Sequence, residues 1–220
     1  RSSMDKDKKN CYSFCMCPGG FVIQASSEPG RLVTNGMSYH ARDGFYANSA
    51  LLTSVRPGED FGSGVLDGIT YQESIEQKAY ILGGSNAYVP VMAVEDFLRV
   101  HAGKEISLRN KLQTSMRPGI SVQDLTSIYS EAVTQRIALG LEEIDRNMPG
   151  FAGSEANLLG VETRSSSPVR WTRDNARREA IDHPGLYPIG EGAGYAGGII
   201  SAALDGLRGA ERFISEYKPI

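Results

Sequence analysis

Glycines crowd a short stretch near the C-terminal end of the sequence, where they could let a ligand approach the main chain closely. Gly192, Gly194 and Gly197 form a G-x-G-x-x-G pattern, which Gly190 and Gly198 extend. A glycine-rich turn before a helix directs unpaired N–H groups and the positive end of the helix dipole toward an electron-rich ligand. The pattern alone is weak, because the dinucleotide fingerprint also needs a second strand with an acidic residue about 20 residues further on. The sequence ends at Ile220 without such a strand, so we expect a closing unit rather than the opening unit of a Rossmann domain.

The acidic residue inside this turn narrows the choice of ligand. Glu191 would repel a bare phosphate, but it could accept hydrogen bonds from sugar-type hydroxyls while the helix end faces a carbonyl or a developing anion. A flavin offers both groups, in its ribityl chain and in the N1/C2=O edge of its ring. The alternative is a tight turn in which the glycines serve packing alone. The predicted cofactor contacts are Gly190, Glu191, Gly192, Ala193, Gly194, Tyr195, Ala196, Gly197, Gly198 and Ile199.

Two cysteines near the N-terminus are candidates for redox chemistry. Cys15 and Cys17 precede a Pro-Gly-Gly turn, and residues i and i+2 of a strand share a face, so both thiols could line one pocket and exchange electrons with a flavin. They are equally well interpreted as small buried residues before a turn. Tetrahedral zinc needs four ligands, and Cys11 with three scattered histidines forms no second pair, so we expect no metal site.

A hydroxyl-rich segment with two arginines is the candidate substrate site. Arginines beside serine hydroxyls suit a carboxylate or phosphate group. The predicted substrate-binding residues are Glu162, Arg164, Ser165, Ser166 and Arg170, and Arg164 is also a catalytic candidate with Cys15 and Cys17. Arg173, Arg177, Arg178 and Trp171 would enlarge this basic patch. The alternative is a solvated strand edge held by salt bridges.

The composition favours a cytoplasmic globular protein. The net charge of −3 argues against nucleic acid as a partner, and no apolar run has the roughly 18 residues that a membrane span needs. Three cysteines crowded into seven residues do not form a secreted disulfide framework.

Strands and helices alternate in blocks along the chain. Strands are predicted at 21–25 and 31–34, joined by a Pro29-Gly30 turn, and at 50–55, with a polar loop over 35–49. Helices are predicted from Thr70 to Leu82, from Pro90 to near Gly103, and, as the longest helix, from Ser121 to Pro149. Residues 103–119 and 174–184 are expected to be loops, and 157–173 to be strand-like at both ends. A last strand at 186–189 precedes a helix whose apolar face carries Ala196, Ile199, Ile200, Ala203, Leu204, Leu207, Ala210 and Ile214. This order predicts an α+β (mixed α/β) fold.

Four motifs together resemble a known family. CYSFCMCPGG, VTNGMS followed by ANSALL, VETRSSSPVR and GLYPIGEGAGYAGGIISAALDG are similar to the C-terminal part of bacterial uncharacterised FAD-dependent, or NAD(FAD)-utilising, dehydrogenases. The similarity runs from about Cys11 to Ile214.

The resemblance implies a two-domain FAD/NAD(P)-binding flavoprotein, in which an α/β substrate-side domain is inserted into a Rossmann-type FAD domain. It implies a disordered or expression-derived end at 1–10, the substrate-side domain at 11–184 and a flavin-contacting strand, turn and helix at 185–220. The N-terminal FAD-binding unit would be absent from this chain and would be its partner. The implied activity is hydride transfer through FAD to or from an unidentified small molecule, with NAD(P)H as electron donor, and we expect this chain alone to be inactive. The competing expectation is a non-catalytic ligand-binding module without flavin.

Overall fold

The computed structural model describes residues 11–217, which divide into two compact units. Unit 1 contains the described residues up to Ser63 together with Tyr71–Thr163, and unit 2 contains Gly64–Thr70 and Arg164 onward. The division after Thr163 lies earlier in the chain than the one expected after residue 184. The expected disordered end at 1–10 lies outside the described residues. No helix within 11–217 is long and apolar enough to cross a membrane.

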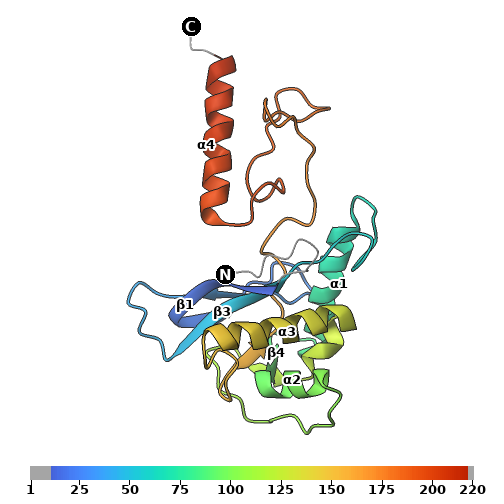
Figure 1. The fold of residues 1–220 in the computed structure, drawn as a ribbon, viewed down its shortest axis with the longest axis vertical. Coiled ribbons are helices and arrows are strands. Elements are labelled where there is room, and N and C mark those ends of the chain that lie inside the picture. The colour runs from blue at the N-terminus through green and yellow to red at the C-terminus, as the bar shows by residue number, and fades with distance from the viewer. Residues whose placement is uncertain (1–10, 218–220) are drawn as a thin grey trace. The chain divides into compact units, whose positions relative to one another are not determined.

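The first sheet of unit 1 is antiparallel and has the order β2-β1-β3 (Figure 1). It is built from β1 (Cys11–Gln24), β2 (Thr34–Met37) and β3 (Tyr46–Thr53). Gln24 pairs with Thr34, so the predicted antiparallel pairing is present, with Gly30 at a φ of 72° in the connection, but the second strand is Thr34–Met37 and not 31–34. The loop predicted at 35–49 is wrong at both ends, where β2 and β3 pair with β1. These residues are polar and show no apolar alternation, so only the pairing with β1 makes them strands.

The second sheet is small and buried, in the order β5-β4-β6. β4 (Val89–Ala93) pairs in parallel with β5 (Ile120–Val122) and antiparallel with β6 (Asn157–Leu159). Every residue of β4 is buried. The prediction that Pro90 opens a helix is therefore wrong: the run around it is a core strand, and α2 (Val94–His101) begins after it.

The helices of unit 1 close the core around these sheets. α1 (Asp67–Leu82) confirms the predicted helix and begins before the expected Thr70 cap. The predicted helix from Ser121 is wrong as a single element, since Asp124 caps a short 3-10 helix (Leu125–Ile128) and Ser130 caps α3 (Glu131–Asn147). α3 packs against β1 and β3, and α2 packs against both α3 and β4 (Figure 1). Val133, Ile137 and Leu141 form the buried stripe of α3.

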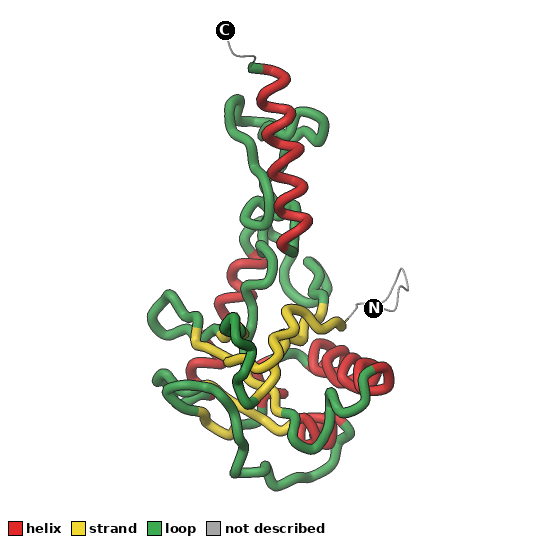
Figure 2. Tube along the Cα trace, turned by 90° about the vertical axis from the view of Figure 1, so that its left-hand side faces the viewer, coloured by secondary structure: helices red, strands yellow, loops and turns green. Residues whose placement is uncertain are grey.

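The described part of unit 2 consists of loops, the first four residues of α1 (67–70) and one complete helix, α4 (Ile199–Glu216), which Figure 2 shows as a continuous rod. At 18 residues α4 is longer than α3, which has 17, so the prediction that α3 would be the longest helix is wrong. The predicted strand at 186–189 is also wrong. In the part of the chain that the structure describes, this segment has no strand partner, and Ile189 instead packs against Gly209, where an added Cβ would overlap its side chain.

Candidate functional site

The glycine turn before α4 is held by its own main chain. Gly194 N–H donates to Glu191 O over 2.8 Å, and Tyr195 N–H donates to Gly190 O over 3.0 Å. Gly190 and Gly194 have φ angles of 78° and 82°, in the region that favours glycine. A Cβ on Gly194 would also lie 2.6 Å from the main-chain oxygen of Val169. These two glycines are therefore required by the fold itself.

The other glycines of the turn are not required in this way. Among residues 11–217, a Cβ on Gly192 or Gly197 would meet no atom within 4 Å, and one on Gly198 would meet only Ser201 Oγ at 3.8 Å. None of the three has a positive φ. Open space on the Cβ side leaves the main chain accessible to something outside unit 2, which is what a ligand-binding turn provides.

The first turn of α4 points its N–H groups out of the helix. The first helical hydrogen bond runs from Ala202 N–H to Gly198 O, so Ile199 and Ile200 precede it and have no partner within the helix. Both residues are exposed, as is Glu191. A shallow hollow of about 190 Å³ lies beside the turn and is lined by Trp171, Leu186, Pro188, Gly192 and Ala193. Of the predicted cofactor residues, Gly190 and Ala193 are buried, whereas Glu191, Gly192, Gly197 and Ile199 are exposed.

A buried ion-pair network supports the turn. Asp205 of α4 accepts hydrogen bonds from Arg173, from Arg178 and from the N–H of Gly190, which lies 2.9 Å from Oδ2. The bond from Arg173 is the main reason that the pKa of Asp205 falls to about 2, and Gly190 and Arg178 add to it. Asp205 was missed by sequence reasoning. The signal was a carboxylate among the small residues Ala202, Gly206 and Gly209 of α4.

Tyr195 is fixed by the arginines of the predicted basic patch. The guanidinium of Arg173 stacks 3.5 Å from the ring centroid, and that of Arg170 lies 5.1 Å away. The hydroxyl donates to Trp171 O over 2.8 Å, and Arg170 Nε donates to Gly194 O over 2.8 Å. Arg170 and Tyr195 therefore order the turn.

The predicted basic patch is largely neutralised. Arg173 is buried against Asp205, Arg178 pairs with the same carboxylate, and Arg177 pairs with Glu179 and Glu216. Arg173, Arg177 and Arg178 therefore do not add open positive charge to the patch, because each of these three has an anionic partner. Arg164 and Ser166 are exposed in unit 2, and Ser165 is half-buried there.

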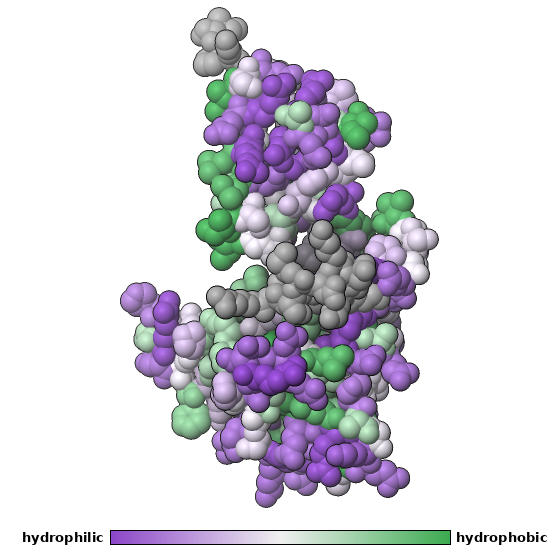
Figure 3. Space-filling view, in the orientation of Figure 1, coloured by the Kyte–Doolittle hydropathy of each residue, from purple (hydrophilic) through white to green (hydrophobic). Residues whose placement is uncertain are grey.

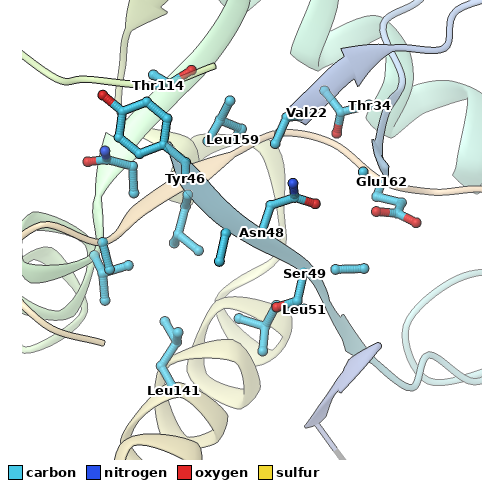
Figure 4. Close-up of a pocket in the computed structure, with 18 of the residues that line it drawn as sticks. Val22, Thr34, Tyr46, Asn48, Ser49, Leu51, Thr114, Leu141, Leu159 and Glu162 are labelled. Atoms are coloured by element: carbon cyan, nitrogen blue, oxygen red, sulfur yellow. The ribbon is translucent and has the colours of Figure 1, made fainter. Parts of the chain in front are cut away.

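The fifth predicted substrate residue, Glu162, belongs to unit 1, where it lines a cavity of about 470 Å³. Figure 4 shows this cavity, with β3 running through it and Tyr46, Asn48 and Ser49 on its wall. Apolar side chains from the core, among them Phe97, Leu141 and Leu159, form most of the remaining surface. Its size and mixed lining are those of small-molecule sites, which range from about 300 to 1,000 Å³.

The cysteines do not line this cavity as a pair. β1 is irregular between Phe14 and Cys17, and Cys15 has a φ of 49°. The irregularity breaks the i, i+2 alternation, so Met16 is at the cavity wall and neither Cys15 nor Cys17 is. Burial, then the neighbouring Cys17 and Glu162, raises the pKa of the Cys15 thiol, which disfavours the reactive thiolate. Within 11–217, no group of three or more His, Cys, Asp or Glu side chains could hold a metal ion.

Cys11 packs against α3. Its side chain lies where a Cβ on Gly140 of α3 would be. Burial, opposed in part by a hydrogen bond from the Tyr12 main chain, raises the pKa of Cys11 to about 11. This thiol therefore joins β1 to α3 by packing.

The fold and the sites define a mixed α/β protein whose unit 1 holds a ligand-sized cavity and whose unit 2 presents a glycine turn at a helix N-terminus. The chain belongs to the family described as "FAD-dependent protein, C-terminal domain-like", which matches residues 2–165. This match ends within two residues of the boundary of unit 1 at Thr163. The family match therefore covers the cavity and leaves the glycine turn outside.

A relative in Clostridium beijerinckii, described as "Uncharacterized protein", is 45% identical over 213 residues. The alignment covers 97% of this chain and 39% of the relative. The chain thus spans about two fifths of the length of the curated relative that it matches.

Proposed function

We propose that this chain is the C-terminal part of an FAD-dependent oxidoreductase, and that its glycine turn contacts the flavin end of the cofactor. The observation that carries the proposal is the accessible main chain at Gly192, Gly197 and Gly198, where neither backbone conformation nor internal packing calls for glycine. Membership of an FAD-dependent family supports it independently. Bound FAD would supply the two-electron chemistry.

The residues of the turn have separate roles in this proposal. The N–H groups of Ile199 and Ile200 and the α4 dipole favour negative charge at the adjacent ring edge, by about 0.3–1 kcal/mol at an exposed helix end. Glu191 accepts hydrogen bonds from the ribityl hydroxyls. Asp205 and Arg173 hold the turn in position, and the Tyr195 ring stacks on Arg173.

The partner of unit 2 in this proposal is the remainder of the longer protein. The apolar face of α4 is exposed, with Ile199 84%, Ile200 73% and Leu207 61% accessible. Figure 3 shows these hydrophobic side chains gathered along α4. An amphipathic helix normally buries such a face, and the relative has more than half of its length outside the aligned region. We assign the FAD-binding part of the same protein to this face.

The test is to purify the longer protein that contains this chain and to record its visible spectrum with and without added FAD. A bound flavin spectrum that bleaches anaerobically with NADPH or NADH supports the proposal and identifies the electron donor. A colourless protein that takes up no FAD on reconstitution contradicts it.

A further inference from the structure

The cavity of unit 1 contains an amide that the fold leaves unsatisfied. Nδ2 and Oδ1 of Asn48 are both buried and have no hydrogen-bond partner within residues 11–217. Two glycines make room for this amide: a Cβ on Gly20 would lie 2.8 Å from Nδ2, and one on Gly36 would overlap Oδ1. Native proteins rarely leave both ends of a buried amide unpaired, and such groups usually meet a ligand or water. Asn48 therefore offers a donor and an acceptor to a cavity occupant.

A carboxylate in the same cavity also lacks a partner. Glu162 is half-buried, and no hydrogen bond or ion pair holds its side chain within residues 11–217. Its pKa is raised, with burial as the cause. Asn48 and Glu162 both line this cavity, and both are labelled in Figure 4. A half-buried carboxylate without a counter-charge is most stable when a cation joins it.

The charge of the cavity lining also favours a cationic occupant. Glu155 and Glu162 both belong to it, and none of its residues is lysine, arginine or histidine. An anionic occupant would lose its hydration and meet only negative charge. This differs from the anionic substrate expected from the arginines of 164–170, since those arginines belong to unit 2.

We propose that the cavity of unit 1 binds a small organic cation, an ammonium group carried on an apolar body of about the size of an aromatic ring. The ammonium pairs with Glu162 and donates to Asn48 Oδ1, while Asn48 Nδ2 is available to an acceptor on the ligand. The apolar body lies against Leu51, Phe97, Leu141 and Leu159. The inference rests on unit 1 alone and goes beyond the proposed flavin chemistry, so it can hold or fail whether or not FAD binds.

The experiment compares three probes with the same aromatic body and different charge. Calorimetric titration of the 220-residue chain at neutral pH uses 2-phenylethylamine (positive), 2-phenylethanol (neutral) and 3-phenylpropionate (negative). We expect the amine to bind at least about tenfold more tightly than the alcohol, and the carboxylate to show no measurable binding.

Substitutions separate the two polar groups. Glu162→Gln keeps the shape and removes the charge, so the amine should lose its advantage and bind within about twofold of the alcohol. Asn48→Leu should weaken the amine and the alcohol together, because both lose a hydrogen bond to the amide, and the amine should keep part of its advantage through Glu162. Glu142→Gln, on the exposed surface of α3, is the matched control and should change neither affinity. Thermal melting checks that each variant is folded.

Three results would overturn the proposal. The first is binding of 3-phenylpropionate as tight as that of the amine. The second is an equal effect of Glu142→Gln and Glu162→Gln, because the preference would then come from net charge alone. The third is loss of amine binding in the longer protein, since the cavity would then be filled by protein. If Asn48→Leu does not fold, the comparison of amine and alcohol on Glu162→Gln still decides the role of charge.

Discussion

Arg173 and Asp205 form a bidentate ion pair in the interior of unit 2. Nη1 lies 2.9 Å from Oδ2 and Nη2 lies 2.7 Å from Oδ1, and Arg173 is 6% exposed. The same carboxylate receives the N–H of Gly190, while Arg173 Nη1 also donates to Pro188 O. The pair therefore joins α4 to both the segment before the glycine turn and the turn itself.

Removing the charge of Asp205 should destabilise unit 2. In Asp205→Asn the buried guanidinium of Arg173 loses its counter-charge, and breaking such a pair costs about 3–5 kcal/mol. Thermal melting followed by limited proteolysis of α4 measures the effect. Asp182→Asn, an exposed carboxylate nearby in sequence, is the control and should melt as the parent does.

The same residue predicts an acid dependence. The pKa of Asp205 falls from 3.8 to about 2 on folding, so the folded state favours the carboxylate. This contribution to stability is complete above pH 4 and is lost as the pH falls from about 4 to about 2. Unfolding free energies measured across this range should fall more steeply for the parent than for Asp205→Asn. Equal slopes would contradict the assignment.

Two helical glycines should respond in opposite ways to alanine. Gly206 of α4 has no atom within 4 Å of an added Cβ, so Gly206→Ala should stabilise by up to about 1 kcal/mol through helix propensity. Gly140 of α3 has Cys11 in that space, so Gly140→Ala should destabilise despite the same propensity gain. Chemical denaturation of both variants checks this. The double variant Gly140→Ala with Cys11→Gly should recover part of the loss.

A large side chain at an open glycine of the turn should leave the stability of the 220-residue chain unchanged. The same side chain should weaken FAD binding by the longer protein. Gly197→Leu meets no atom within 4 Å of its Cβ, so the melting temperature of the 220-residue chain should be unchanged. In the longer protein, the same change should weaken FAD binding by at least about tenfold, or 1.4 kcal/mol, if the cofactor approaches the main chain there. Ala176→Leu, an exposed change of similar size in unit 2, should leave FAD binding intact. Retained affinity in Gly197→Leu would remove the turn from the cofactor site.

The exposed face of α4 should matter only in the longer protein. Ile200→Glu and Leu207→Glu place charges on positions that are 73% and 61% accessible, so the 220-residue chain should melt normally. Burying either charge against the FAD-binding part should weaken the association of the two parts when they are produced as separate chains. Arg208→Glu, exposed on the same helix, is the control. A loss of stability in the 220-residue chain itself would mean that this face is already covered within it.

The sequence correctly predicted those elements that depend on neighbouring residues alone, such as turns and amphipathic helices. The turn at Gly30, the termination of α1 at Gly83 and the core stripe of α3 follow from turn chemistry and from a 3.6-residue period, and each is present. The helix predicted to begin at Pro90 is absent. Proline favours a helix start, but every residue of β4 is buried, and burial in a central strand outweighs this local preference. Residues 186–189 are apolar like a strand, but no neighbouring strand supplies their hydrogen bonds.

The sequence by itself determined the glycine turn, the α4 helix and the family, because these depend on residue types at fixed spacing. Only the tertiary structure decided which glycines are required by the fold and which are open, and that Arg173 is neutralised by Asp205. It also placed Glu162 with Asn48 in the cavity of unit 1, and Arg170 with Tyr195 in unit 2. The physical reason is that charge pairing, burial and open space depend on neighbours far apart in the chain, and no local spacing encodes them.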